Sequence, residues 1–557
     1  MSYYDLGSYC RPVATQSSDT QKWFNRGLIW NYAFNHEASA ECFEKAIESD
    51  ENCPMAYWGL SYTLGPNYNK PWSIFDESDR SQTVSKALQA ATKAKELAKG
   101  STQVEIALID ALQQRYPKEP TAENCSSCNQ SFAEAMEVVY HQYPNDLDVA
   151  TIYADALMNL TPWALWDLKT GLPAHNNGAR TMEIKVLLER AMRLPGSRQH
   201  PGLLHLYIHL MEMSSMPEVA LPAADLLRGL VPDAGHLNHM PTHIDVLCGD
   251  YCRAISSNSE AIRADEKYLA QAGALNFYSL YRSHNYHFRI YAAMFAGQSA
   301  VALSTVDALE KSIPEKLLRI ESPPMADWLE GFLATRLHVL VRFGLWNKII
   351  DVQLPNDSNL YCVTTAMTHY AKAVALAAIG KIEKAENQQA LFCSAANLVP
   401  DSRTLFNNKC KDILKIAEQM LAGEVEYRKA NFKTAFAHLE KAIDLDDNLP
   451  YDEPWGWMQP TRHAYGALLL EQGYVEKAAK VYSADLGYDN SLPRALQHPN
   501  NIWALSGYHE CLVNLGKYAE AGIIEQQLKI ARSLADVHIQ SSCYCRQRRQ
   551  NRVTGFS

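Results

Sequence analysis

Hydrophobic and polar residues along this chain show no period-two alternation of useful length, which is the pattern that a half-buried strand produces. We therefore expect an all-α protein. A second pattern, Gly-x-x-x-x-Ala, recurs where one helix would turn into the next. Clear copies begin at Gly249, Gly297, Gly380, Gly473 and Gly516, and looser copies begin at Asn35, Gly344 and Ala430.

The recurring pattern has a physical explanation. A glycine tolerates left-handed backbone at the end of a helix, and a small residue lets two helices approach closely. Neighbouring copies between Gly249 and Gly516 are roughly 36 to 50 residues apart. This spacing predicts a degenerate repeat of helix pairs.

Two segments show the repeat most fully. Residues 35–60 carry alanines, Phe43, Pro54 and Gly59 at regular places, and residues 424–447 show a similar pattern. These segments resemble tetratricopeptide (TPR) repeats. The resemblance implies a right-handed α-solenoid of degenerate TPR-like hairpins, with a concave inner surface.

The chain also resembles, nearly from end to end, a group of mostly uncharacterised bacterial and fungal TPR-like proteins with paired histidines. The matching stretches are 32–38, 56–60, 65–72, 200–212, 235–244, 284–288, 341–346 and 451–457. This resemblance implies the helical-repeat fold and includes the histidine pairs, but it implies no particular activity.

A length of 557 residues is too great for one compact globule unless the architecture is modular. The sequence predicts four parts. They are N-terminal TPR-like repeats over 1–160, central histidine-rich repeats with a metal site over 161–300, further TPR-like repeats over 301–535, and a tail with Cys and Arg residues over 536–557.

Charge and composition narrow the range of partners. The formal net charge is −10, and the single basic run lies at 546–552, so nucleic acid is not expected as a ligand. The sequence has no signal-peptide pattern and no run of about 18 apolar residues, so no membrane partner is expected. Thirteen cysteines, an odd number, suit a reducing compartment, and we expect a cytoplasmic protein in which Cys543 and Cys545 are surface thiols.

Histidines are concentrated in the middle of the chain. Eight of the 18 fall between His200 and His287, and six of them form pairs at helical contact spacing. The pairs are His205/His209, His239/His243 and His284/His287. Neutral imidazole is the commonest metal ligand in proteins, so the pairs predict a site for one metal ion or two. The competing interpretation is a buried hydrogen-bond network that ties neighbouring repeats together.

Other residues near the pairs have candidate roles. Glu212 lies on the helical face of the first pair and could be a fourth ligand, an acceptor that orients an imidazole, or a general base. Tyr207 is a candidate proton donor. Pro241 interrupts the second pair, so a helix could start between its members, and His236 could replace either one.

The residue types indicate which metal would bind. Coordination by imidazoles alone fits copper or zinc, whereas a carboxylate such as that of Glu212 would favour iron or manganese. Six helix-borne histidines in pairs have the ligand arrangement of dicopper proteins that activate oxygen, so we expect copper first, with zinc and iron as alternatives.

Two functions are compatible with these observations. In the first, the protein is a metal-dependent enzyme that oxidises a small organic substrate, held by aromatic loops at 61–80, 160–180 and 448–463. In the second, it is an adaptor that binds a peptide or protein partner on its concave face. The fold alone does not decide between the two functions.

Overall fold

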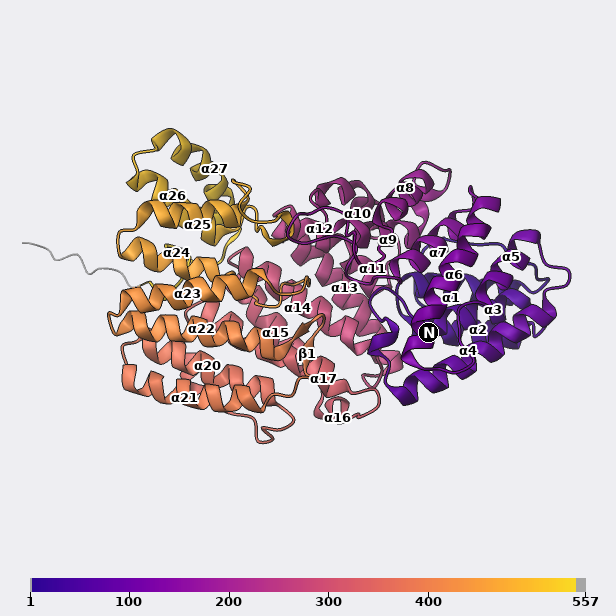
Figure 1. Ribbon diagram of the computed structural model, residues 1–557, viewed down its shortest axis with the longest axis horizontal. Helices are drawn as coiled ribbons and strands as arrows, with labels where there is room; N and C mark the ends of the chain where they lie inside the picture. Colours follow the sequence, from indigo (N-terminus) through magenta and orange to yellow (C-terminus); the bar gives the residue numbers. More distant parts are fainter. Residues whose placement is uncertain (1–2, 547–557) are drawn as a thin grey trace, which may run out of the picture.

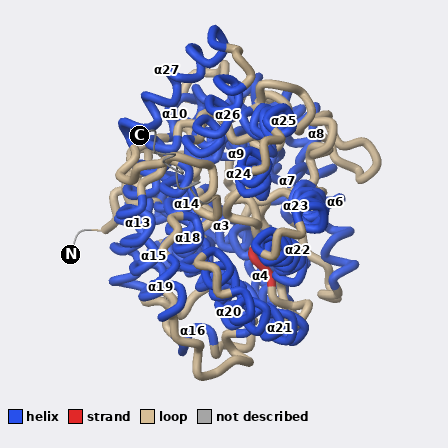
Figure 2. Tube along the Cα trace, turned by 90° about the vertical axis from the view of Figure 1, so that its left-hand side faces the viewer, coloured by secondary structure: helices blue, strands red, loops and turns tan. Residues whose placement is uncertain are grey.

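The computed structural model describes residues 3–546, and these form helices nearly throughout, which confirms the predicted all-α class (Figure 1). The strands of the described range, β1 (Thr404–Leu405) and β2 (Asn408–Lys409), form one short antiparallel hairpin. Figure 2 shows the strands as a brief red segment among helices and loops. The fold is an α-solenoid of TPR-like helical hairpins.

The helices follow one another in three parts of the molecule. The N-terminal helices lie at the right of Figure 1 and are α1 (Ser18–Tyr32), α2 (His36–Ser49), α3 (Pro54–Leu64), α4 (Glu77–Leu97), α5 (Gln103–Leu112), α6 (Ala122–Gln142), α7 (Leu147–Met158) and α8 (Thr181–Ala191). The central helices are α9 (Pro201–Met211), α10 (Leu221–Leu227), α11 (Gly235–His239), α12 (Pro241–Leu247), α13 (Tyr251–Ala272) and α14 (Ser279–Phe295).

The remaining helices extend to the left of Figure 1. They are α15 (Ser299–Ser312), α16 (Glu315–Leu318), α17 (Met325–Leu329), α18 (Thr335–Arg342), α19 (Trp346–Asp351), α20 (Cys362–Ala378), α21 (Ile382–Leu398), α22 (Cys410–Arg428), α23 (Phe432–Asp447), α24 (Thr461–Glu471), α25 (Val475–Leu486), α26 (Ile502–Asn514) and α27 (Tyr518–Leu534). Short 3₁₀ turns complete the described range at η1 (Trp72–Ile74), η2 (Ser197–Gln199), η3 (Pro217–Ala220), η4 (Glu330–Ala334) and η5 (Arg494–Leu496).

The predicted turns between helices are present. The glycines of the repeated pattern have φ between 62° and 83°, the left-handed backbone that glycine adopts without a steric cost; they are Gly249, Gly297, Gly344, Gly380, Gly473 and Gly516. The small residue five positions later is buried against the neighbouring helix in each clear copy, as at Ala302 and Ala385. Ala430 takes the glycine's place with φ of 64°.

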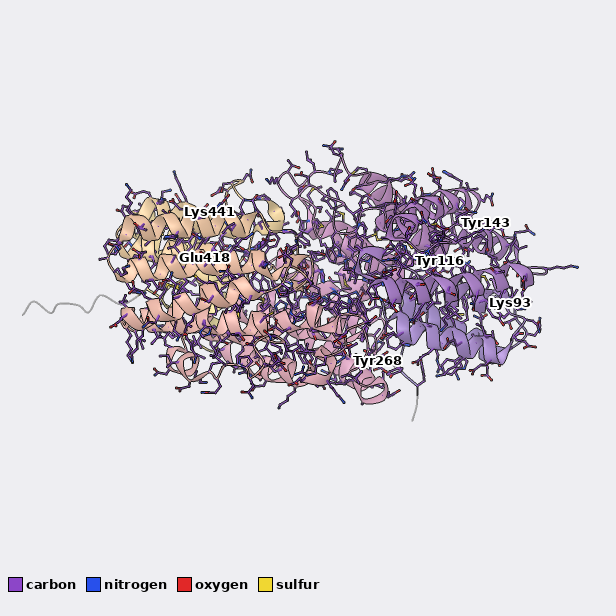
Figure 3. All side chains as sticks on the ribbon, turned by 60° about the horizontal axis from the view of Figure 1, so that its bottom comes forward. Lys93, Tyr116, Tyr143, Tyr268, Glu418 and Lys441 are labelled. Atoms are coloured by element: carbon purple, nitrogen blue, oxygen red, sulfur yellow. A yellow bond between two sulfur atoms is a disulfide. The ribbon has the colours of Figure 1, made fainter. Side chains whose placement is uncertain are left out.

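Successive helices pack in pairs, and their outer faces are charged. Neighbours such as α1 with α2, α20 with α21 and α22 with α23 contact along their length. Lys93 on α4, Glu418 on α22 and Lys441 on α23 are exposed on the surface (Figure 3). Among the helices of the described range, none is both long and apolar enough to cross a bilayer.

Segments from both ends of the chain pack on the central helices. Near the N-terminus, the Tyr9 hydroxyl donates a hydrogen bond to Asp148, and the Tyr9 ring lies 4.7 Å from the His200 ring, centroid to centroid. From the C-terminal helices, the Trp503 indole donates to the carbonyl of Met294 at the end of α14, at 2.7 Å. The interior of the central helices is therefore enclosed from both sides.

Candidate metal centre

Four helices supply the histidines of the candidate centre. The chain enters α9 with His200 as the N-cap and Pro201 in the first turn, where a proline costs no hydrogen bond. Pro241 likewise begins α12, so the second predicted pair lies on either side of a helix junction. The helices bring six buried imidazoles together: His205 and His209 from α9, His236 and His239 from α11, His243 from α12, and His284 from α14.

The first histidine group is His205, His209 and His236, whose ligand atoms lie within 4.8 Å of one another. His205 Nδ1 is 2.7 Å from the carbonyl of Tyr32, the last residue of α1. Because a carbonyl only accepts, His205 carries its proton on Nδ1 and presents a lone pair at Nε2. His209 Nδ1 donates to Glu212 Oε1 at 3.0 Å in the same way. Within the described part of the chain, neither Nε2 atom has a hydrogen-bond partner.

The second histidine group is His239, His243 and His284, whose ligand atoms also lie within 4.8 Å of one another. His239 Nδ1 is 2.7 Å from Asn258 Oδ1. The amide nitrogen of Asn258 donates to the carbonyl of Ala254, so its Oδ1 is an acceptor and His239 Nδ1 is a donor. His243 Nδ1 donates to Glu212 Oε2 at 2.6 Å. In the neutral form of each ring, Nε2 is then the atom that carries the lone pair.

Glu212 connects the two groups. Each of its carboxylate oxygens accepts a hydrogen bond from one ring, His209 in the first group and His243 in the second. This is the arrangement in which a carboxylate orients a metal-binding imidazole and fixes its tautomer. Among the three roles that the sequence left open for Glu212, the geometry favours the orienting acceptor, although the carboxylate also lies within ligand range of His209 and His243.

Burial favours the neutral form of five of the six histidines. It lowers the pKa of His205, His209, His236, His239 and His284 well below the usual value, and neighbouring histidines lower it further. Unprotonated imidazole is the form that binds a metal ion. The interior therefore holds these histidines in the form that a metal requires.

A second carboxyl group, Glu453, also reaches His243. Its Oε2 lies 2.6 Å from His243 Nδ1, the same ring nitrogen that Glu212 contacts. Burial, and then the nearby Glu212, raise the pKa of Glu453 well above its ordinary value. Burial raises the pKa of Glu212 as well, but the hydrogen bond from His243 opposes that rise, so the electrostatics favour Glu453 over Glu212 as the protonated carboxyl group. Glu453 lies in the 448–463 loop, and no sequence pattern indicates it as a site residue.

His287 and Tyr207 lie away from both histidine groups, whereas His236 belongs to the first. His287 does not join either histidine group: it follows His284 on α14 by three positions but lines a cavity of ≈20 Å³ together with His338. Burial lowers its pKa to about 3. His236, named above as a possible replacement in another pair, completes the first group instead. Tyr207 lies on α9 two positions from both His205 and His209, on the opposite face, and its hydroxyl donates to Glu189 at 3.1 Å.

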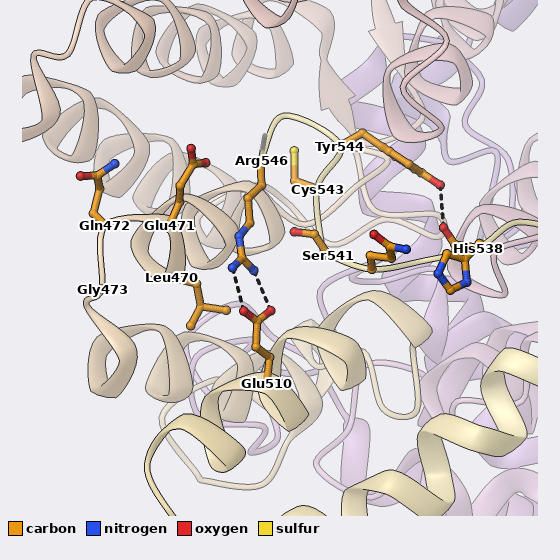
Figure 4. Close-up of a pocket in the computed structure, with 11 residues that line it drawn as sticks. Leu470, Glu471, Gln472, Gly473, Glu510, His538, Ser541, Cys543, Tyr544 and Arg546 are labelled. Atoms are coloured by element: carbon orange, nitrogen blue, oxygen red, sulfur yellow. Dashed lines mark hydrogen bonds and ion pairs between the residues drawn. The ribbon is translucent and has the colours of Figure 1, made fainter. Parts of the chain in front are cut away.

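A cavity of ≈840 Å³ lies far along the chain from the histidines, beside the C-terminal segment (Figure 4). Glu510 and Arg546 form a two-pronged ion pair in its wall, with contacts of 2.6 and 2.7 Å. Cys543, at its edge, is joined to Cys545 in a disulfide, whereas the sequence predicts two free thiols. None of the predicted site residues lines this cavity.

Comparisons with known proteins add little to this geometry. No protein-family model matches the chain, and no curated protein sequence matches it. Among solved structures, the chain is similar to yeast Tom70, with 13% sequence identity over 92% of this chain and 93% of that chain, at a TM-score of 0.30. It is also similar to a chain in the structure of Naa15/Naa10 bound to HypK-THB, with 13% identity over 92% of this chain and 70% of that chain, at a TM-score of 0.20.

Proposed function

We propose that this protein is a TPR-like scaffold whose central helices bind transition-metal ions through the two histidine groups. One observation carries the proposal: the Nε2 atoms of His239 and His243 lie 2.7 Å apart, while the Nδ1 atom of each ring donates to an oxygen. With both Nδ1 atoms donating, the Nε2 lone pairs face each other unless a proton or a metal ion lies between or beside them. Two nitrogens bonded to one ion at ~2.0–2.1 Å lie about 2.9 Å apart at a right angle and about 3.3 Å apart at the tetrahedral angle, so a small separation of the two rings would admit an ion.

The surroundings of the first histidine group support the same function. The Nε2 atoms of His205 and His209 are buried without a hydrogen-bond partner among the described residues, and so are both ring nitrogens of His236. Buried polar atoms without partners are uncommon, and an ion that is bound in the native protein is one of the explanations for them. A purely structural hydrogen-bond network would use these atoms as donors or acceptors.

Copper is the metal that we propose first, with zinc and iron as alternatives. Each group offers three imidazoles, a ligand set that suits copper or zinc, and the groups adjoin each other, with the rings of His209 and His243 at 5.7 Å between centroids. A bound pair of copper ions would supply redox chemistry with oxygen. The protein itself would orient the imidazoles through Glu212, the Tyr32 carbonyl and Asn258, and exclude water by burial. We expect the bacterial and fungal proteins that share the paired histidines to share the centre.

Oxidation of a small organic substrate is the use that we propose for a copper centre. The scaffold role has the broader support for the chain as a whole, because it follows from the helical-repeat fold without any assumption about a metal.

A specific observation also favours a protein or peptide partner. The last described helix, α27, exposes Ile523, Ile530 and Leu534 on one face, with exposed fractions of 66%, 66% and 46%. Apolar side chains grouped on a surface helix are typical of an interaction site.

Elemental analysis tests the metal proposal. Protein produced in media supplemented with copper, zinc or iron is purified, and its metal content is compared with that of a His239→Ala/His243→Ala variant. The matched control is His369→Ala/His438→Ala, two helix histidines that each bond a glutamine in the C-terminal repeats. We expect at least one equivalent of metal in the wild type and the control, and a clear loss in the first variant. A folded wild type without metal in all three media would contradict the proposal.

A further inference from the structure

Three aromatic residues around the histidines have a backbone conformation that bulky residues rarely adopt. They are Phe34, Trp163 and Phe406, with φ of 55°, 58° and 49°. Each packs on a candidate ligand: Phe34 lies 4.5 Å from His205, Trp163 lies 5.7 Å from His209, and Phe406 lies 4.7 Å from His284, between ring centroids. Strained backbone persists where the surrounding structure enforces it, and such places cluster at functional sites.

Trp163 is partly exposed, as is Phe406, and it also lines a surface groove. It lines a groove of ≈760 Å³ on the surface, together with Trp166, Met213 and Tyr451. Behind it, the ring packs on Tyr68 at 5.0 Å and on His209. The Trp163 indole therefore contacts His209 on one side and lines the groove on the other.

Tyr451 forms the adjoining wall. Its ring lies 6.3 Å from the Trp163 ring at an angle of 30°, and its hydroxyl donates a long hydrogen bond, 3.5 Å, to the backbone carbonyl of Glu212. Tyr68, Trp163 and Tyr451 come from the 61–80, 160–180 and 448–463 loops respectively. The three loops that were expected to hold a substrate thus meet at one place beside the candidate ligands.

The chemistry of the groove indicates its ligand. Aromatic faces stack on planar rings. Of the charged residues that line the groove, Asp167 already accepts hydrogen bonds from the backbone and hydroxyl of Thr170, and Lys169 lies exposed at the rim. The inner walls, made by Trp163, Trp166 and Tyr451, therefore suit an uncharged planar compound better than an ion.

We propose that this groove binds a small, uncharged aromatic compound against the adjoining rings of Trp163 and Tyr451 and places it beside the first histidine group. The proposal rests on the metal-binding function above, since it assigns the groove as the substrate site of that centre. Trp163 and Tyr451 are then specificity-determining residues. Movement of the Trp163 indole opens the way from the groove to His209.

Calorimetric titration with indole, an uncharged planar probe, tests the groove. The main variant is Trp163→Asn, because asparagine tolerates left-handed backbone and removes the aromatic ring while the fold is kept. Trp163→Phe retains a ring, and Tyr451→Leu removes the adjoining wall. Trp23→Ala is the matched control, since Trp23 is a partly exposed tryptophan on α1, where it contacts Arg26.

We expect Trp163→Asn and Tyr451→Leu to weaken indole binding by about tenfold or more, with Trp163→Phe close to the wild type and Trp23→Ala unchanged. Cyclohexanol, which is similar in polarity but not planar, should bind more weakly than indole. Equal indole affinity in the wild type and in both wall variants would overturn the proposal, and so would cyclohexanol binding as tightly as indole. Circular dichroism establishes that each variant is folded; if Trp163→Asn is not, Tyr451→Leu carries the test.

Metal content, measured on the same preparations, separates this inference from the proposed function. If the protein binds metal normally but Trp163→Asn binds indole as tightly as the wild type does, the groove proposal is refuted and the metal proposal is not. Indole binding that depends on Trp163 in a protein that takes up no metal would refute the metal centre and, with it, the assignment of the groove as its substrate site.

Discussion

His239 and His243 face each other in the protein interior with their Nε2 atoms 2.7 Å apart. Both rings are almost fully buried, with exposed fractions of 0% and 2%. Each ring donates a hydrogen bond from Nδ1, His239 to Asn258 and His243 to Glu212. The contact therefore requires a proton or a metal ion between or beside the two Nε2 lone pairs.

Metal binding should stabilise the fold. An ion that binds the native protein and not the unfolded chain raises the free energy of unfolding by RT ln(1 + [L]/Kd), about 2.7 kcal/mol at a hundredfold excess over Kd. We expect the melting temperature of metal-free protein to rise when copper or zinc is added, in a concentration-dependent way. The His239→Ala/His243→Ala variant should show a much smaller rise. An equal rise in both proteins would mean that the metal binds elsewhere.

Glu212→Gln should weaken both histidine groups at once. The amide keeps the size of the side chain but offers one acceptor oxygen, so at most one of His209 and His243 keeps its hydrogen-bonded orientation. We expect the metal affinity to fall by about 10- to 100-fold, measured by competition with a chelator of known affinity. Glu189→Gln is the control, because Glu189 bonds Tyr207 on the far face of α9. Unchanged affinity in Glu212→Gln would argue against its orienting role.

Ala430→Gly should stabilise the C-terminal repeats. Ala430 has φ of 64° at a turn where the other repeats have glycine, and left-handed backbone costs an alanine about 1–2 kcal/mol. The more flexible unfolded chain of the glycine variant offsets part of this gain. We expect a net stabilisation of about 0.5–1 kcal/mol in urea unfolding.

The reciprocal change supplies the control for that experiment. Gly380 occupies the equivalent turn with φ of 80°, and a Cβ added there would meet nothing within 4 Å. Gly380→Ala should therefore destabilise the protein by about 1 kcal/mol through backbone strain alone. Two variants that shift stability in the same direction would contradict the explanation.

Asp148 should make the stability depend on acidic pH. Burial alone would raise its pKa, but Arg11 at 2.7 Å, with hydrogen bonds from His200 and Tyr32, holds the pKa well below its ordinary value. A folded pKa below the unfolded value of about 3.9 means that the stabilisation is complete above that value and is lost as the pH falls below it.

The variant that tests this is Asp148→Asn. It should destabilise the protein by about 3 kcal/mol near neutral pH, because Arg11 keeps a buried charge with fewer partners. The difference from the wild type should narrow as the pH falls below about 4. Asp110→Asn, at an exposed ion pair with Lys95, should leave the pH dependence of urea unfolding unchanged. A difference that stayed constant down to pH 2 would exclude Asp148 as its source.

The candidate site could be predicted in part. Spacing of four residues within one helix fixes a shared face, so His205 and His209 could be paired from the sequence alone. The spacing of three residues on α14 also predicted a pair, His284 and His287, but the two side chains have different surroundings. His284 belongs to the second histidine group, whereas His287 lines the small cavity with His338. Glu453 carried no local signal, since its carboxyl group meets His243 across a sequence distance of 210 residues, from position 243 to position 453.

The sequence by itself determined the all-α class, the left-handed turns at the recurring glycines and the local pairing of histidines, because each depends on backbone conformation and on neighbours within one or two turns. The tertiary structure alone decided that six imidazoles from α9, α11, α12 and α14 meet, that Glu212 joins the two groups, and that Trp163 stands between them and a groove. The physical reason is that a helix fixes the angle between its own side chains, whereas the packing of one helix on another fixes which of those side chains meet.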